Sequence, residues 1–565
     1  MTTAPSSPAL RPEAPAQCVL LFAAGSPLFE DGDLQMLARS AGVQQAWSQG
    51  LARGGESLLS RVGGSFALAW RTVDGTTCLA TDRFAVQSMC WRMDCNTLRW
   101  AQRADALAPR AMDALDPQAL FDYLYFHVIP SPRTVFRGVR RLPPGHLLRC
   151  TLDGQVTLQP FWQPQFEPVR QPDFAQLANQ FRGRLEAAVG AQLDGSKPAC
   201  FLSGGTDSST VAGMIGLAGG TPAHTYSIGF EAEGYDEMAY ARLAAKHFGC
   251  THHEYYVTPA DLVQRMAEVA THYDQPFGNS SAVPAYFCAR MAHADGVSHI
   301  LAGDGGDELF GGNTRYAKQT VFSWYGRLPD GLRTQGLEPL LRRDRLGNLG
   351  LLKKAASYSE QARVPMPDRL QSYNLLERLG IDEVLTPEFL SQVRPQLPLE
   401  DQRGVWQSIA ADNDLDRMLA FDWRYTLAET DLPKVMGTTG LAGLSVGFPM
   451  LDPGLVDLAQ RLPADYKLRR LKLRWFFKEA LRGFLPDEII RKPKQGFGLP
   501  FGVWAHRDRA LFDMCAAALH SLAGRGLVQP RFLQRLLQEH LPSHPKYYGE
   551  MVWILVMLEL WLAGR

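Results

Sequence analysis

The sequence predicts an α/β protein with two domains, a β-rich layered domain followed by a domain built on a doubly wound parallel sheet. Three observations support this prediction. Short strand patterns separated by turns fill the chain up to about residue 161. Later strand patterns alternate with helical stretches, which is typical of a parallel sheet. Between the two parts lies a stiff connector punctuated by Pro160, Pro164, Pro168 and Pro172.

The N-terminal strands are expected where short apolar or alternating runs are bounded by glycine and proline. These runs are residues 19–23, 65–71, 77–81, 88–93 and 146–151. Residues 1–17 are rich in Pro, Ala and Ser and contain no basic segment leading into an apolar one, so we expect a disordered tail and not a signal peptide. The expected organisation is a tail at 1–17, an N-terminal domain at 18–160, a Pro-rich linker at 161–172 and a C-terminal domain at 173–565.

The C-terminal domain is expected to begin with a helix capped by Asp173. Its apolar face is Phe174, Leu177, Phe181, Leu185 and Val189. Strand candidates follow at 199–202, 224–230, 252–257 and 297–302. In doubly wound sheets the ligand lies beyond the carboxyl ends of the strands, which is where residues 203–209 and 303–307 fall.

The rest of the C-terminal domain is expected to be mostly helical. Residues 318–430 predict a helical region without a chemical signature. The apolar run 551–562 is interrupted by Glu559 and is too short to span a bilayer, so it predicts a buried helix. Adjacent residues on a strand point to opposite faces, so His252 and His253 predict one core and one surface histidine and not a metal pair.

Composition excludes several classes of function. The 58 basic residues balance the 58 acidic ones, so nothing attracts nucleic acid or a charged membrane in bulk. The nine cysteines are scattered without a CxxC pair, which favours reduced thiols in a cytoplasm and disfavours a zinc site.

The segment CFLSGGTDSST at 200–210 predicts a phosphate site. An apolar strand breaks into a Gly-rich turn and then opens a helix, so the backbone N–H groups of the turn and the helix dipole face an anion. The expected nucleotide-binding residues are Leu202, Ser203, Gly204, Gly205, Thr206, Asp207, Ser208 and Ser209. A carboxylate beside a phosphate repels it unless a divalent cation lies between them, so Asp207 is predicted to be a magnesium ligand. No Walker motif occurs in the chain.

A second acidic motif, ILAGDGGDELFGG, lies at 300–312. Its glycines let the backbone approach a nucleotide, and Ala302 and Gly303 are expected to do so. Asp307 is the natural second carboxylate for the cation. The spacing of a calcium-binding loop is absent.

The loop SGGTDSS resembles the pyrophosphate loop of the ATP-pyrophosphatase group, which includes asparagine synthetase, argininosuccinate synthetase, GMP synthetase and β-lactam synthetase. The resemblance implies ATP and Mg²⁺ as cofactors and cleavage between the α and β phosphates. In asparagine synthetases the position that matches Asp307 carries a magnesium ligand. The position that matches Asp304 faces the reacting acyl group. Asp304 would then orient or deprotonate the attacking amine; the alternative is that it bonds loop amides. The matching residues Ser227, Ile228 and Gly229 imply a nucleotide pocket.

The N-terminal segments 64–70, 81–85, 101–107 and 134–146 resemble, in order, the glutaminase domain of class B asparagine synthetases. That resemblance implies an αββα sandwich of the N-terminal-nucleophile type. The family nucleophile is an N-terminal cysteine followed by glycine, whereas here the second residue is Thr2, and Cys18 is followed by Val19. We interpret Cys18 as a small buried thiol, and glutamine is not the expected amine source.

Two later stretches also resemble asparagine synthetases. Residues 431–435 (DLPKV) and 441–452 match an altered form of the family pattern, with Ser445 and Gly447 where that pattern has Glu and Arg. Residues 485–497 restore the match, and the resemblance implies that Lys494 neutralises charge on the α-phosphate and acyl centre. A solvated loop lysine is the alternative. Arg474 and Lys478 are candidates to touch phosphate.

Together these motifs look most like a lasso-peptide macrolactam synthetase, a class of bacterial asparagine synthetase homologues. The resemblance implies adenylation of an Asp or Glu side chain in a precursor peptide and attack by the peptide's own N-terminal amine. The implied partners are the precursor peptide and a leader-peptide protease, and the implied location is the bacterial cytoplasm. Alternatives are an ammonia-dependent asparagine synthetase, a β-lactam synthetase-like enzyme, and a non-catalytic nucleotide- or peptide-binding scaffold.

Overall fold

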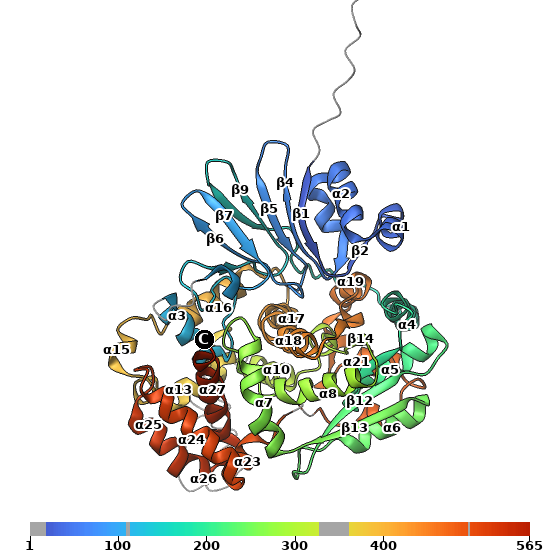
Figure 1. Cartoon of the computed structure of the whole chain (residues 1–565). Coiled ribbons are helices and arrows are strands. Elements are labelled where there is room, and N and C mark those ends of the chain that lie inside the picture. The colour runs from blue at the N-terminus through green and yellow to red at the C-terminus, as the bar shows by residue number, and fades with distance from the viewer. Residues whose placement is uncertain (1–17, 109–113, 327–360, 495, 497) are drawn as a thin grey trace, which may run out of the picture. The chain divides into compact units, whose positions relative to one another are not determined.

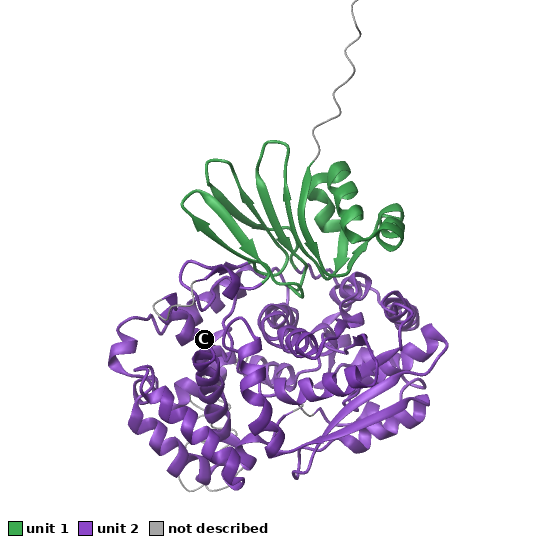
Figure 2. Ribbon diagram, in the orientation of Figure 1, with its two compact units in different colours: residues 1–102, 142–163 green, residues 103–141, 164–565 purple. Residues whose placement is uncertain are grey.

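The computed structural model describes residues 18–108, 114–326, 361–494, 496 and 498–565. The expected tail at 1–17 lies outside the described residues, as does part of the helical region, at 327–360. The chain forms two compact units, Met1–Gln102 with Leu142–Gln163, and Arg103–Arg141 with Pro164–Arg565 (Figure 2). We call them unit 1 and unit 2. The chain crosses between them three times, and the third crossing, after Gln163, falls inside the predicted linker.

The segment Arg103–Arg141 belongs to unit 2, although the sequence places it in the N-terminal domain. Its hydrogen bonds explain this assignment. The hydroxyl of Tyr123 donates to the carbonyl of Ile554 at 2.8 Å, and Asn374 donates to the carbonyl of Tyr125 at 2.9 Å. The segment contains η2 (Asp105–Leu107), α3 (Pro117–Phe126) and β8 (Arg140–Arg141).

Unit 1 is built on a five-stranded antiparallel sheet in the order β1-β4-β5-β9-β10. The strands are β1 (Val19–Ala24), β4 (Ala67–Arg71), β5 (Thr77–Thr81), β9 (His146–Cys150) and β10 (Val156–Pro160). Alternate side chains serve opposite faces. Leu68 and Trp70 join one buried cluster with Trp47, whereas Ala67 and Ala69 join another.

These two clusters define the layers of unit 1. The first contains residues of α1 (Gly32–Ala41), α2 (Val43–Gly54) and η1 (Gly55–Arg61). The second contains residues of β6 (Cys90–Asp94) and β7 (Thr97–Ala101). A short hairpin joins β2 (Pro27–Phe29) to β3 (Val62–Gly64). All five predicted strands are confirmed, with β4 and β6 each beginning two positions later than expected. The α-helices in the described part of unit 1 are α1 and α2, so it provides three layers of the expected αββα sandwich.

Unit 2 contains the expected parallel sheet, in the order β13-β12-β11-β14-β15. Three of its strands, β12, β13 and β14, are labelled in Figure 1. The strands are β11 (Ala199–Phe201), β12 (His224–Phe230), β13 (Thr251–Val257), β14 (His299–Leu301) and β15 (Ser445–Gly447). The chain winds outward from β11 in one direction and continues from β14 in the other. The order therefore reverses between β11 and β14, where such sheets place a ligand. The four predicted strands are confirmed; β15 was not predicted.

The helices around this sheet begin where the sequence indicates. Asp173 caps α4, with its carboxylate accepting from the N–H of Gln176 at 3.1 Å, as predicted. The helices between the strands are α4 (Phe174–Ala191), α5 (Thr206–Gly219), α6 (Met238–Phe248), α7 (Pro259–His272), α8 (Ala282–Ala294), α9 (Gly306–Phe310) and α10 (Thr314–Gly326).

The described part of the predicted helical region is helical. Its elements are η5 (Asp368–Gln371), α13 (Leu375–Leu379), α14 (Ile381–Val384), α15 (Pro387–Leu390), α16 (Leu397–Ser408), α17 (Asp414–Asp422) and the π-helix η6 (Trp423–Asp431). The chain continues directly into α18 (Leu432–Ala442), which packs on α8. Another short π-helix, η8, lies near the C-terminus.

The remaining elements complete unit 2. They are η7 (Pro449–Leu451), α19 (Pro453–Arg461), α20 (Ala464–Lys467), β16 (Leu468–Arg469), β17 (Lys472–Leu473), α21 (Trp475–Ala480), α22 (Asp487–Arg491), α23 (Phe501–Arg507), α24 (Arg509–Ala523), α25 (Pro530–Arg535), η8 (Leu536–His540), α26 (Leu541–Ser543) and α27 (Pro545–Ala563). Helix α27 is buried, as predicted, and its Glu559 is satisfied by Ser521 and Arg525. Among the described residues, no helix has the length and apolar character needed to span a bilayer.

Candidate active site

The predicted phosphate loop connects β11 to α5 at the carboxyl end of the central strand. Gly204 has φ +70°, and a Cβ there would lie 2.5 Å from the N atom of Ala241, so the position requires glycine. The N–H of Ser203 donates to the hydroxyl of Ser208 at 3.1 Å, which folds the turn onto the first turn of α5. The free N–H groups at the start of this helix provide the anion site that the sequence indicates.

A cavity of about 590 Å³ lies over the carboxyl ends of the strands. Most of the predicted site residues line it, namely Leu202, Ser203, Asp207, Ser208, Ser227, Ile228, Gly303, Asp304, Asp307 and Lys494. Gly205 and Thr206 line an adjoining cavity of about 540 Å³, together with Arg474, Lys478 and Lys492. We call the first the main cavity and the second the phosphate-side cavity.

Four predicted residues line neither of these two cavities. Gly204 supports the turn described above, and Ser209 is fully buried on α5. Gly229 lies under Tyr256, whose ring would be 2.6 Å from an added Cβ. Ala302 continues β14 by donating its N–H to the carbonyl of Gly447 at 2.9 Å. Direct nucleotide contact by these four residues stays a prediction.

Arg474 joins the two acidic motifs. Its guanidinium donates to both carboxylate oxygens of Asp207, to Asp307 Oδ1 at 2.9 Å and to the hydroxyl of Thr206 at 2.9 Å. The side chain is almost fully buried, and its backbone has φ +56°, an uncommon value for arginine. The sequence indicated only that Arg474 could touch phosphate; its position between the two carboxylates was not foreseen.

Lys494 reaches the same cluster from the loop after α22. Its ammonium pairs with Asp307 Oδ2. Burial lowers the pKa of Lys494, but Asp307 and Asp207 more than compensate and raise it above its usual value, so the side chain is cationic. For Asp307 the effects have the opposite sign: burial raises its pKa, but Arg474 and Lys494 more than compensate and bring it below its usual value. The predicted lysine therefore lies at the cavity as a fixed positive charge.

The donor set at Asp207 and Asp307 fits Mg²⁺, because both side chains line the main cavity and both offer only oxygen. Their oxygens are paired with Arg474 and Lys494, so an ion would replace part of these contacts. Magnesium in nucleotide sites is held by one or two carboxylates together with substrate phosphates. These two residues would hold the ion, which would neutralise the phosphates when bound.

A second charged cluster lies in the same cavity. The Lys434 ammonium is 3.5 Å from Asp304 Oδ1 and 3.2 Å from Asp431 Oδ1. Burial raises the pKa of Asp304, an effect that Lys434 opposes and Asp431 reinforces. Among the hydrogen bonds of the described residues, Asp304 accepts none from a loop amide. In the sequence, Lys434 and Asp431 stood out only as part of the DLPKV motif. The pairing of Lys434 with Asp304 was not predicted.

A further cavity of about 560 Å³ adjoins the main cavity on the side of this cluster. The two share the lining residues Phe126, His127, Val128, Thr426, Thr430 and Glu550. The further cavity is lined by charged and amide side chains and by six Phe or Tyr rings, for which we call it the aromatic cavity: Tyr125, Phe126, Tyr373, Phe421, Tyr425 and Tyr547. Thr430, next to Asp431, lines both cavities, and the aromatic cavity is not lined by residues of the phosphate loop.

In unit 1, Cys18 is half-buried and packs against the apolar cluster that contains Trp47. All nine cysteines are free thiols. We expected a small buried thiol; Cys18 does pack against apolar residues, but it is only partly buried.

Comparison with known proteins identifies the family. The model of the asparagine synthase family matches residues 180–563, and that of a glutamine amidotransferase domain matches residues 48–162. The chain belongs to the asparagine synthase family. Its members are ATP-dependent amide ligases, which agrees with the phosphate loop and the acidic motifs. The amidotransferase match begins at residue 48 and so does not include Cys18.

Relatives with different names resemble this asparagine synthase family chain at similar levels. Asparagine synthetase [glutamine-hydrolyzing] 1 of Bacillus subtilis is 24% identical over 510 residues, covering 90% of this chain and 78% of the relative. A putative asparagine synthetase [glutamine-hydrolyzing] of Mycobacterium tuberculosis is 26% identical over 590 residues, covering 98% and 85%. Amidase chry2 of Gibberella zeae is 23% identical over 495 residues, covering 80% and 71%.

Proposed function

We propose that this asparagine synthase family member is a lasso-peptide macrolactam synthetase. It would adenylate an Asp or Glu side chain in a precursor peptide and join it to the N-terminal amine of the same peptide. The observation that carries the proposal is the aromatic cavity beside the Asp304–Lys434–Asp431 cluster. A free amino acid would not use that space, whereas a peptide extending from the reacting carboxyl would contact its aromatic walls.

The proposed chemistry has two steps. A side-chain carboxylate oxygen attacks the α-phosphorus of ATP, the bond to the bridging oxygen breaks and pyrophosphate leaves. The amine nitrogen then attacks the acyl carbon, gives up a proton, and the acyl–oxygen bond breaks with release of AMP. Because amine and acyl group belong to one molecule, the amine acts at high effective concentration.

The site residues supply binding, charge and proton acceptance. The turn at 203–206 and the start of α5 bind phosphate, and Lys494 stabilises the charge that develops on the α-phosphate. Asp304 is the proposed acceptor of the amine proton, because its pKa is raised and it faces the cavity. Lys434 holds Asp304 in place and opposes the rise in its pKa that burial causes.

The surroundings of Cys18 support the proposal that the substrate supplies its own amine. This cysteine packs against an apolar cluster and precedes Val19, so unit 1 offers no glutaminase nucleophile at this position. An ammonia-dependent asparagine synthetase is the alternative that the names of the relatives favour. A β-lactam synthetase-like reaction is also consistent with the acidic motifs.

The test is incubation of the enzyme with ATP, Mg²⁺ and a leader-free peptide that carries an internal Asp or Glu. We expect a product lighter by one water, about 18 Da, with AMP and pyrophosphate formed in step. Tandem mass spectrometry should place the new amide between the N-terminal amine and that side chain. Formation of asparagine from aspartate and ammonia, or accumulation of ADP, would contradict the proposal.

The proposal includes a bacterial cytoplasmic location and a leader-peptide protease as partner. A precursor that still carries its leader should react only when the protease is added. Equal rates with and without the protease on that precursor would remove the partner from the proposal.

A further inference from the structure

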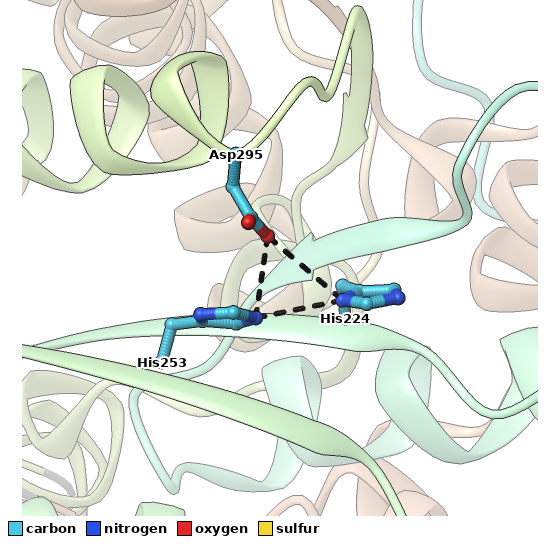
Figure 3. A group of neighbouring side chains, drawn as sticks. All are labelled: His224, His253 and Asp295. Carbon is cyan, nitrogen blue, oxygen red and sulfur yellow. Dashed lines mark hydrogen bonds and ion pairs between the residues drawn. The ribbon is translucent and has the colours of Figure 1, made fainter.

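A second cluster of side chains that can bind a metal lies at the amino ends of strands of the same sheet, whereas the main cavity lies at their carboxyl ends. His224 begins β12, His253 lies near the start of β13, and Asp295 follows the last turn of α8 (Figure 3). The main cavity is lined by Tyr226, Ser227 and Ile228, farther along β12, and by none of the three residues of the cluster. This cluster is therefore separate from the acidic motifs, and the proposed ligation does not use it.

The three side chains converge on one point. His224 Nδ1 lies 3.4 Å from His253 Nε2, and Asp295 Oδ2 lies 3.3 Å from His253 Nε2 and 4.0 Å from His224 Nδ1. Two ligands bound tetrahedrally to zinc at their usual bond lengths are about 3.4 Å apart. Two of the three separations match this spacing, and the third needs a small rotation of a partly exposed side chain.

Hydrogen bonding explains the arrangement less well. The two ring nitrogens face each other, so a neutral pair can place only one proton between them. His224 Nδ1 is too far from the carboxylate for a hydrogen bond. A metal ion would take one lone pair from each of the two ring nitrogens, in the tautomers that leave both unprotonated, and one from the carboxylate.

The surroundings orient this cluster. The hydroxyl of Tyr226 donates to Asp295 Oδ2 at 2.6 Å, and its ring stacks on His253 with centroids 4.8 Å apart. Such outer contacts fix ligand orientation in metal sites. Lys197 competes with a metal, because it donates to the same oxygen at 2.7 Å. It also donates to the backbone carbonyl of Asp295 at 2.9 Å, a bond it can keep when the carboxylate binds an ion.

We propose that His224, His253 and Asp295 form a binding site for a divalent transition metal of the zinc type. Two imidazoles and one carboxylate, with water in the fourth position, suit Zn²⁺ and its neighbours better than Mg²⁺. The ion joins the amino ends of β12 and β13 to the end of α8. The sequence pattern missed this site because His253 pairs with a residue on the neighbouring strand and not with His252.

The experiment titrates the full chain, stripped with a chelator, with Co²⁺ as the spectroscopic probe and Zn²⁺ as competitor. Excess Mg²⁺ is kept present so that the carboxylates of the main cavity are supplied with a hard cation. We expect one Co²⁺ per chain, visible ligand-field absorption without thiolate charge-transfer bands, and displacement by Zn²⁺. Zn²⁺ should also raise the unfolding temperature.

Variants locate the site. His224→Ala and His253→Ala should each weaken binding at least about tenfold. His252→Ala is the matched control, since that ring contacts Thr225 on the other face of the sheet, and it should bind like the wild type. Lys197→Met should strengthen binding, because it removes the competing ammonium. Asp295→Asn gives a second ligand variant of unchanged shape if an alanine variant fails to fold.

Wild-type affinity in His224→Ala or His253→Ala would overturn the proposal. Thiolate bands in the bound spectrum would do so as well, because they would assign the ion to cysteine. Absence of stoichiometric binding by both the wild type and Lys197→Met would show that the cluster is a hydrogen-bonded group only.

Discussion

The main cavity contains two acidic pairs that differ in how their charge is compensated. Asp207 and Asp307 face two cations, Arg474 and Lys494, so their charges balance. Asp304 and Asp431 share a single cation, Lys434, and keep one negative charge in excess. The balanced pair lies at the phosphate loop and the unbalanced pair lies toward the aromatic cavity. An excess negative charge attracts an incoming ammonium, and Asp304 lies there as a carboxylate that can accept its proton, so the second pair suits the amine step.

The largest effect should follow from breaking the balanced pair. Asp307→Asn should reduce turnover by about a thousandfold or more, because it removes a proposed magnesium ligand and the partner of Lys494. AMP release with substrate peptide measures the rate, and thermal unfolding checks that the variant folds. A folded variant with wild-type turnover would remove Asp307 from the metal site.

Removing one cation from that pair should cost less. Lys494→Ala should still bind ATP but react about a hundredfold more slowly or worse, since the charge on the α-phosphate appears only as the reaction proceeds. Lys494→Arg is the matched control and should retain part of the rate. Equilibrium ATP binding and single-turnover AMP formation separate the two effects. An unchanged rate in Lys494→Ala would mean that Lys494 is a solvated loop lysine without a part in the reaction.

The unbalanced pair should respond through pH. The raised pKa of Asp304 predicts that the rate of the amine step falls as pH drops through that pKa, because the proton acceptor becomes protonated. Lys434→Met removes the opposing cation, so the pKa of Asp304 should rise further and the acid limb should move to higher pH, by about one unit. Pre-formed acyl-adenylate and a pH series isolate this step. Asp304→Asn should abolish the acid limb; an identical limb in that variant would assign the base to another residue.

The smallest effect is expected outside both pairs. Cys18→Ala should leave ATP-dependent turnover unchanged, because this thiol only packs against the core of unit 1. The wild type should release no ammonia from glutamine. Glutaminase activity that disappears in Cys18→Ala would revive the asparagine synthetase alternative.

Local patterns explain why much of this site could be predicted from the sequence. The strand, turn and helix around Asp207 are contiguous, so composition and spacing specify them directly. The cap at Asp173 and the four strands β11 to β14 follow for the same reason. Strand β15 could not be predicted in this way. A run of three residues containing Ser445 and Gly447 has a weak strand preference and pairs only through its tertiary position.

Contacts between distant segments are the part that the sequence concealed. Arg474 meets Asp207 across 267 positions of chain, and no spacing rule links them. His224 and His253 become neighbours only through the register of β12 and β13. The segment Arg103–Arg141 resembles one domain in sequence order but forms its hydrogen bonds within the other unit.

The π-helix η6 has a consequence for how the unbalanced pair is built. At its start, Trp423 anchors to the carbonyl of Glu308 at 2.9 Å, and at its end lies Asp431, followed by Lys434 in α18. The π-helix therefore sets the rotational phase of α18 relative to the second acidic motif. Deleting one residue between these two points would turn α18 around its axis, by about 100° for a residue of an α-helix and by less for one of the wider π-helix. Lys434 would then leave Asp304, so length in this segment is as much a requirement of the site as the identity of its side chains.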